Sequence, residues 1–484
     1  MSLSGSLSNA LSGLTAAARA TEIVSSNISN AMTEGHARRE LQLAPRLFGG
    51  LGGGVQVTGV KRVVDQSILG DRRLADAAVA DSRLRSDFHK QLELALGSPT
   101  VPNSISGRIS TLDTALVEAA SRPDSEGRLA TVMTAANDLA ASIRSVAQQV
   151  SDARTNADRA ISRDVDFVNS TLKNLDEMNA RILAQTAAGR DTSALLDQRQ
   201  AMIDGLSKVI PVVEMPRDNN QIALFSKGGA ILLDGGPAEL SFTPKTYVTP
   251  EMSQALGDLS GLKLNGQAIP TGTTGILSGG SLGAAFQLRD ELAPAAQVQL
   301  DAVARNLIDR FAAPGLDPTR PAGQPGLFTD KGAALDPAKE LGLANRLTTN
   351  ALPDPARGGA LWRLRDGLGA TAPGDVGNGS LLSALDRALN TPQAPASGNF
   401  LGAARSLSGV AADLLSQVSS QRLGAEADTA YATARQETLK TLHLSDGVDT
   451  DAEMQRLLQI EQAYAANARV VQTIDDMLSQ LLRW

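Results

Sequence analysis

Residues suited to acid–base chemistry are few in this chain and lie far apart. Its 484 residues include no cysteine and only three histidines, His36, His89 and His443. A histidine acts as a general base when a neighbouring group orients its ring, yet these three occupy unrelated contexts, in a turn, on a helix and before a turn. No nucleophile elbow, His-Glu-x-x-His or P-loop motif is present. We expect each histidine to be a surface or capping residue, and we predict no catalytic residues and no enzyme.

A group of carboxylates near the C-terminus has the chemistry of a calcium site. Its members are Asp446, Asp449, Asp451 and Glu453. An EF-hand loop has glycine at its sixth position, whereas here Gly447 stands at the second, so we predict no metal site. Thr450 and Glu453 fit a capping box instead, in which the Thr450 hydroxyl accepts from the Glu453 amide and the Glu453 carboxylate returns to the Thr450 amide.

The helix that this cap would begin is one of two terminal segments with apolar residues at heptad spacing. The N-terminal set is Leu3, Leu7, Ala10, Leu14, Ala17, Thr21, Val24 and Ile28, and the C-terminal set is Leu457, Ile460, Tyr464, Asn467, Val471, Ile474, Leu478 and Leu481. A 3.5-residue period places each set on one seam that needs a partner helix. We predict that the two terminal helices pair as a coiled coil. Asn467 either lies on the seam, where a polar residue fixes register, or is rotated into solvent.

The predicted N-terminal helix, residues 2–31, is almost uncharged on its outer side as well. Only Arg19 and Glu22 carry charge there. A helix that faces water normally has charges opposite its apolar stripe. We therefore expect other subunits to cover this helix; the alternative is that it packs on its own domain.

Between the two ends, the pattern predicts long helices and one β-rich segment. Helical spacing covers residues 64–96, 125–188, 195–206, 300–311, 381–389 and 407–439, with a small β-hairpin near residues 39–57. Unbroken, the 125–188 helix would be about 95 Å long, and we expect the 407–439 helix to lie alongside it. Residues 211–280 contain short β-like runs between turn formers.

The predicted fold class is mainly α with an inserted β-rich domain, in which terminal helices paired as a coiled coil join a long helical-bundle rod and an outer β insertion. The predicted domains are an inner coiled-coil domain of residues 1–45 and 445–484, a helical rod domain with a small hairpin of residues 46–210, 281–313 and 400–444, a β-rich insertion of residues 211–280, and a loop-rich excursion of residues 314–399.

Composition excludes several classes of partner. The net charge is −7 without a run of basic residues, so we predict no nucleic-acid partner. No segment reaches the roughly 18 consecutive apolar residues of a membrane span, so we predict no membrane insertion. Aromatic residues make up 3% of the chain, which leaves little material for aromatic ligand pockets, and we predict no cofactor. The first 18 residues lack the Lys or Arg of a signal-peptide n-region.

Several segments resemble the flagellar axial proteins of the rod and hook. Residues 25–31 (Ser-Ser-Asn-Ile-Ser-Asn-Ala) are similar to the family signature that ends its first helix, and residues 447–454 and 462–470 are similar to its closing signature. More narrowly, residues 53–57, 195–199 (Leu-Leu-Asp-Gln-Arg) and 283–290 resemble the hook-associated proteins. Residues 32–36, Met-Thr-Glu-Gly-His, depart from the family's Asn-Thr-Pro-Gly-Tyr-like turn, which leaves the conformation of this turn open.

The resemblance implies a structural component of the bacterial flagellum that joins hook to filament. It further implies type III export without signal cleavage, an extracellular location at the hook–filament junction, and four partners: further copies of the chain in a ring or helical layer, the hook protein, a second hook-associated junction protein, and an export chaperone at the C-terminal helix. Alternatives are another axial protein, hook or flagellin-like, and a secreted enzyme with its site in residues 211–280 or 314–375.

The predicted assembly interface consists of seam residues and two asparagines of the N-terminal signature. Its members are Leu3, Leu7, Leu14, Val24, Asn27, Ile28, Asn30, Leu457, Ile460, Tyr464, Asn467, Val471, Ile474, Leu478 and Leu481. Because the isolated neutral helices would bury too little apolar surface to offset their ordering entropy, we expect the folding of the two ends to be coupled to assembly.

Overall fold

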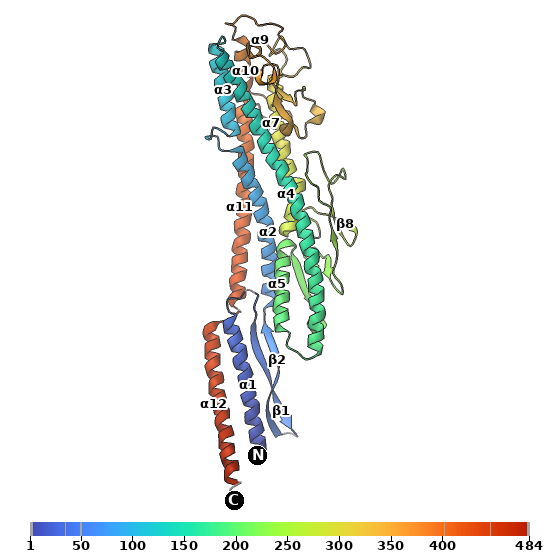
Figure 1. Ribbon diagram of the computed structural model, residues 1–484, viewed down its shortest axis with the longest axis vertical. Coiled ribbons are helices and arrows are strands. Elements are labelled where there is room, and N and C mark those ends of the chain that lie inside the picture. Colours follow the sequence, from blue (N-terminus) through green and yellow to red (C-terminus); the bar gives the residue numbers. More distant parts are fainter. Residues whose placement is uncertain (1–2, 34, 49–50, 401, 446, 482–484) are drawn as a thin grey trace.

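The computed structural model is an elongated rod with both chain ends at the same narrow tip (Figure 1). It describes residues 3–33, 35–48, 51–400, 402–445 and 447–481, so Asp446 of the carboxylate group lies outside the described residues. Two terminal helices and a β-hairpin form the narrow part, here called the foot, and the long helices above it form the shaft. The predicted fold class is confirmed. Within the described residues, no helix is long and apolar enough to cross a membrane.

The helices and strands divide among the foot, the shaft and the far end of the shaft. The foot contains α1 (Leu3–Ser29), β1 (Arg38–Phe48), β2 (Leu51–Val63) and α12 (Thr450–Leu481). The shaft contains α2 (Gln66–Leu96), α3 (Ile105–Ser121), α4 (Glu126–Ala187), α5 (Ser193–Val209), α6 (Gly280–Gln287), α7 (Ala293–Phe311) and α11 (Leu407–Ser445). The far end of the shaft carries β9 (Phe328–Asp330), α8 (Leu343–Arg346), β10 (Leu347–Thr349), α9 (Arg363–Asp366) and α10 (Ser380–Asn390).

The longest element, α4, is one unbroken helix of 62 residues, about 93 Å at 1.5 Å per residue. Its first turn is capped by Ser125, whose side chain accepts from the Arg128 amide. At its other end Gly189 has a φ of 66°, and the Arg190 amide donates to the Gln185 carbonyl at 3.0 Å. This left-handed ending turns the chain back into α5, which gives the antiparallel helical hairpin predicted from the sequence.

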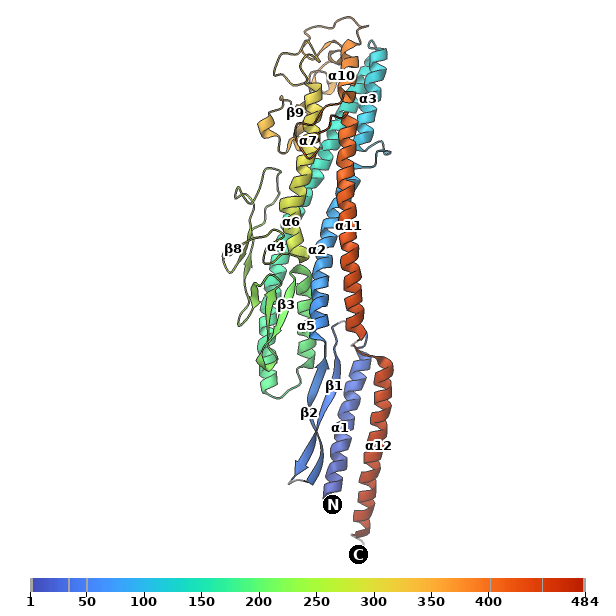
Figure 2. The same cartoon turned by 180° about the vertical axis from the view of Figure 1, so that it is seen from behind.

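The partner predicted for α11 was wrong, because α11 lies along α2 and not along α4 (Figure 2). The apolar stripe of α4 is already covered by α3, α5, α6 and α7. Polar contacts add to the pair: Gln436 of α11 donates to Asp76 of α2 at 2.6 Å, and Arg422 forms an ion pair with Glu93. The heptad spacing located the buried side of α11 and left its partner undetermined.

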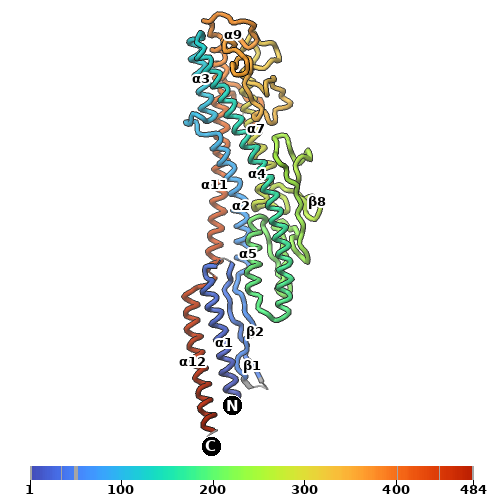
Figure 3. Tube along the Cα trace, in the orientation of Figure 1, coloured from blue at the N-terminus to red at the C-terminus, as the bar shows by residue number. Residues whose placement is uncertain are grey.

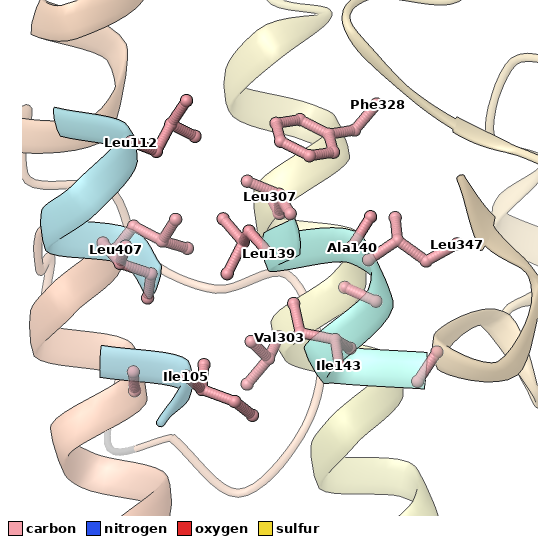
Figure 4. Close-up of a cluster of buried hydrophobic side chains, with 14 of the residues drawn as sticks. Ile105, Leu112, Leu139, Ala140, Ile143, Val303, Leu307, Phe328, Leu347 and Leu407 are labelled. Carbon is pink, nitrogen blue, oxygen red and sulfur yellow. The ribbon is translucent and has the colours of Figure 1, made fainter. Parts of the chain in front are cut away.

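The main core lies in the upper shaft, where α3, α4, α7 and α11 meet (Figure 4). Leu139 and Ile143 of α4 face Val303 and Leu307 of α7, and all four are almost completely buried. The loop-rich segment after α7 completes this core, since Phe328 of β9 packs edge-on against Phe311 at 5.0 Å between ring centres.

Asp301 of α7 holds part of that loop-rich segment in place. Its carboxylate accepts from the amides of Gly342 at 2.7 Å and Ala344 at 2.8 Å, which lie at the start of α8. Burial raises the pKa of Asp301 to about 6, against the opposing effect of these hydrogen bonds. The start of α8 is therefore held against the shaft, while the limits of the four domains predicted from the sequence stay a prediction.

The β-rich segment lies beside α4 (Figure 1). One antiparallel sheet contains β3 (Val212–Pro216), β4 (Ile222–Ser226) and β5 (Ile231–Leu233); the other contains β6 (Leu240–Ser241), β7 (Leu262–Leu264) and β8 (Gln267–Ile269). The side chain of Asn169 on α4 extends the hydrogen bonding into β6, donating to the Leu240 carbonyl and accepting from the Leu240 amide, both at 2.8 Å.

Candidate assembly site in the foot

The two terminal helices lie side by side and run antiparallel (Figure 3). On α12 the seam side is the covered side: Ile474 is 4% exposed, and Leu457, Ile460, Asn467 and Val471 are half-buried. On α1, Val24 is 2% exposed, while Leu3, Leu7, Leu14, Ile28 and Asn30 are half-buried. Tyr464, Leu478 and Leu481 remain exposed. Most of the predicted seam residues are thus covered, Tyr464, Leu478 and Leu481 excepted, and the role of the seam in assembly stays a prediction.

Asn467 lies on the seam next to a glycine of α1. A Cβ added at Gly13 would lie 2.7 Å from Nδ2 of Asn467, which is too close for a side chain. The Asn467 amide nitrogen also donates to the Ala463 carbonyl of its own helix at 3.0 Å. Asn467 is therefore packed between the two helices. Of the two alternatives left open by the sequence, the position on the seam is the one found.

The side of α1 that faces neither α12 nor the hairpin forms an exposed stripe at heptad spacing, here called the outer stripe. Its members are Ser4, Ser8, Leu11, Thr15, Ala18, Glu22, Ser25 and Ser29. Glu22 is the one charged member and pairs with Arg19 at 2.9 Å. A nearly uncharged, small-residue surface of this kind allows close approach of another helix.

Asn27 connects three elements of the foot from a fully buried position. Its Oδ1 accepts from the Arg39 amide at 3.0 Å, and its Nδ2 donates to the Arg39 carbonyl at 2.9 Å and to Oε2 of Glu453 at 3.1 Å. The side-chain amide pairs with the backbone of β1 much as a neighbouring strand would. Asn27 therefore joins the end of α1, the start of β1 and the first turn of α12.

The predicted capping box at Thr450 is wrong. Oδ1 of Asp449 caps α12 by accepting from the amides of Asp451 at 2.9 Å and Ala452 at 3.1 Å. The Glu453 side chain is 3% exposed and points toward Asn27, with Nη1 of Arg38 at 3.9 Å. Because this carboxylate neutralises charge inside the foot, it does not return to the Thr450 amide. Aspartate caps as well as threonine does, so the sequence alone did not separate the two.

Asp197 of α5 receives donors from the foot. Its carboxylate accepts from Nη2 of Arg39 at 2.6 Å, from Nε of Arg62 at 2.8 Å and from the Ala37 amide at 3.4 Å. Arg62 also donates to Gln200 at 2.9 Å. We call Asp197, Arg39 and Arg62 the foot clasp. Of the three, Asp197 lies in the Leu-Leu-Asp-Gln-Arg segment of residues 195–199 that suggested the family resemblance, although the sequence alone assigned this segment no role.

His36 is also part of this contact, so the prediction of a surface or capping histidine is wrong here. Its side chain is 5% exposed, with Nδ1 3.6 Å from Oδ2 of Asp197. Burial lowers the pKa of His36; Asp197 raises it, and Arg39 and Arg62 lower it further. His89 on α2 is buried as well, at 9% exposure.

Acidification is expected to weaken the contact between the His36 turn and α5. Because the folded pKa of His36 lies below its ordinary value of 6.5, the unfolded turn binds the proton more tightly, and stability present above pH 6.5 is lost as the pH falls below it. Hydrogen-exchange protection of β1 and β2, corrected for intrinsic rates, should fall between pH 7 and pH 5. In His36→Phe this pH dependence should be absent; an equal dependence in both proteins would rule out His36 as its source.

Another ion pair, which is fully buried, fixes the β-rich segment to α4. Nη1 of Arg289 lies 2.6 Å from Oδ1 of Asp158, and both side chains are 0% exposed. The other oxygen of Asp158 accepts from the Lys245 amide at 2.6 Å, and the Arg289 guanidinium lies 5.0 Å from the centre of the Phe286 ring. Arg289 belongs to the π-helical turn Leu288–Leu292 between α6 and α7. This pair, here called the insertion clasp, occupies another segment that suggested the resemblance.

One cavity is lined by residues of α2, of the β-rich segment and of α6. It measures about 500 Å³, and its charged lining residues are Asp81, Arg85 and Lys227, of which the first two form an ion pair at 3.0 Å. The remaining lining consists of glycines, hydroxyl residues and a glutamine, without a histidine. In the described part of the chain, no three His, Asp or Glu side chains converge in a way that could hold a metal ion.

Three family models match this chain, and together they cover more than half of it. A model described as "Flagella basal body rod protein" matches residues 7–36, and one described as "Flagellar basal body rod FlgEFG protein C-terminal" matches residues 445–483. Between them, the model "Flagellar hook-associated protein FlgK helical domain" matches residues 89–318. The chain is thus similar to the flagellar rod and hook proteins, and the two end models match the segments that contain most of α1 and α12.

Within that class the chain resembles flagellar hook-associated protein 1. It is 27% identical over 252 residues to the protein of that name from Salmonella typhimurium, covering 50% of this chain and 45% of that protein. The Bacillus subtilis protein of the same name is 23% identical over 273 residues, covering 53% and 54%. The matches thus span about half the length of these relatives. The resemblance predicted from the sequence is confirmed.

Among solved structures, the flagellar hook junction protein FlgK from Burkholderia pseudomallei matches with a TM-score of 0.44 and 21% identity. The alignment covers 55% of this chain and 46% of that one.

Proposed function

We propose that the chain is a structural subunit of the bacterial flagellum that joins hook to filament and assembles through its terminal helices. The outer stripe of α1 carries this proposal: it is exposed, nearly uncharged and spaced as a helix-packing surface. The names of the relatives, which are hook-associated, supply the location.

The exposed surface of α12 supports the same proposal. Only Glu453 and Ile474 are buried among its described residues. Apolar side chains are exposed on more than one of its faces: Met454, Leu458, Tyr464, Val470, Met477 and Leu481. Exposed apolar surface of this extent marks an interaction site. Neighbouring copies of α1 and α12 are the partners we assign to it.

The remaining partners and the location follow from the resemblance. We assign the hook protein and a second hook-associated junction protein to the two sides of the assembled layer, and an export chaperone to α12 before assembly. In this proposal the chain leaves the cell by type III export without cleavage and functions outside it, as a subunit and not as an enzyme.

Antibody–gold labelling of intact flagella tests the location. The proposal predicts label confined to the boundary between hook and filament. Label along the hook or along the filament would assign the chain to a different axial component, and the same preparations from a strain lacking the protein are the control for antibody specificity.

A further inference from the structure

The foot meets the shaft through a small set of polar contacts centred on one carboxylate. Every donor to Asp197 comes from the foot, and Asp197 itself comes from α5 in the shaft. The Asp197 side chain is 15% exposed, and the arginines that reach it are 13–17% exposed. Gly35 brings the turn after α1 close to the same helix, since a Cβ there would lie 3.6 Å from Cβ of Ala201.

Asp197 lies where it can neutralise two positive charges that the hairpin places side by side. Arg39 of β1 and Arg62 of β2 are direct cross-strand partners. Like charges placed opposite each other destabilise a strand pair. The Asp197 carboxylate binds one arginine with each oxygen, Arg39 with Oδ2 and Arg62 with Oδ1, so it neutralises the pair and holds both side chains in one direction.

Arg39 also links this clasp to the paired terminal helices. Its backbone amide and carbonyl are both bonded to Asn27, and Asn27 donates to Glu453 of α12. Its side chain is bonded to Asp197. Arg39 is thus bonded to the terminal pair through its backbone and to the shaft through its side chain. The result is a continuous chain of polar contacts from Glu453 to Asp197.

We infer that Asp197 is a positioning residue that sets the direction of the foot relative to the shaft, acting through Arg39 and Arg62. The chain passes between the two parts twice, from β2 into α2, whose N-cap is Asp65, and from the end of α11 at Ser445 to the start of α12 at Thr450. With the clasp in place, the foot is held on α5 in one orientation. The consequence for assembly rests on the proposed function: copies that pack through both foot and shaft need the same orientation in every copy.

The orientation is measurable in the monomer, independently of assembly. The chain has no cysteine, so cysteines introduced at the exposed positions Ser8 of α1 and Lys173 of α4 carry two spin labels without further changes. Pulsed electron–electron double resonance then measures the distribution of distances between the label on the foot and the label on the shaft. The intact clasp should give one narrow distance distribution.

Asp197→Asn is expected to broaden this distribution at least twofold, because an amide neutralises neither arginine. Asp197→Glu keeps the negative charge and should give a distribution nearly as narrow as that of the unmodified protein. If Asp197 only filled space, the larger glutamate would not be expected to do better than asparagine. Arg62→Gln opens the clasp from the foot side and leaves α5 unchanged; it should broaden the distribution as well, and the double variant should be no broader than the single ones.

The matched control is Asp234→Asn, which removes the exposed pair with Arg217 and should leave the distribution narrow. Narrow distributions in both Asp197→Asn and Arg62→Gln would overturn the inference. Since no flagellum is involved, that failure is distinguishable from a failure of the junction assignment, which only the labelling experiment addresses.

Discussion

Asp158→Ala is expected to lower the free energy of unfolding by about 3 kcal/mol, because it removes the fully buried one of the two carboxylates that bind the Arg289 guanidinium. Arg289 is fully buried and retains only Asp290, whose side chain is 22% exposed, as an ion partner. The loss should concern the contact between α4 and the β-rich segment first, since the Asp158 carboxylate also accepts from the Lys245 amide.

Urea unfolding followed by circular dichroism measures this loss. The control is Asp234→Ala, which removes a carboxylate from an exposed pair with Arg217 and should cost at most about 1 kcal/mol. Equal losses in the two variants would show that the insertion clasp contributes no more than a surface pair.

Ile474→Asp is expected to separate α12 from α1. Among the described residues of α12, Ile474 is the one apolar side chain that is buried. A carboxylate at this position would place a charge in the buried contact with α1, which is unfavourable unless α12 moves away from α1. Detached, α12 would be a single helix in water, where helices are marginally stable. We expect amide protection in α12 to fall on the order of a hundredfold, with α4 unchanged.

Hydrogen exchange of the monomer with mass spectrometry measures this effect. The experiment requires the terminal pair to be folded in the monomer; if α12 is unprotected in the unmodified monomer, the result supports instead the coupling of folding to assembly that the sequence leads us to expect. Gln472→Asp adds the same charge to the same helix at an exposed position and should leave the protection of α12 as it is. Similar protection in the two variants would contradict the pairing of the terminal helices along this seam.

Local pattern was sufficient for much of this fold. The heptads at both ends located the seam down to Asn467, and the apolar spacing from Leu129 to Ile182 identified α4, because burial along one side of a helix repeats in the sequence itself. The β-rich segment was likewise indicated by short runs between turn formers.

Contacts between distant residues were not accessible in the same way. The partner of α11, the burial of His36 and the use of Glu453 all depend on which element lies opposite, and the sequence pattern records only which side of an element is buried. The capping box failed for this reason, since the buried Asn27 lies hundreds of residues from Glu453 in the chain.

The segments that carried the family resemblance gain a physical meaning from the structure. Asp197 and Arg289 lie in two of these segments, and each forms an ion pair between parts of the chain that are far apart in sequence. Asn27 of the N-terminal signature joins three elements of the foot. These residues fix how the parts of the rod are arranged, which suits a protein whose proposed work is to present one shape to its neighbours.

The central claim, that the terminal pair carries assembly, is tested most directly by incorporation into flagella. Cells that lack the natural protein would produce Ile474→Asp or Gln472→Asp, and antibody–gold label at the hook–filament boundary would be counted. The account predicts label and swimming with Gln472→Asp and neither with Ile474→Asp, at equal amounts of protein in the cells. Normal label and swimming with Ile474→Asp would contradict it.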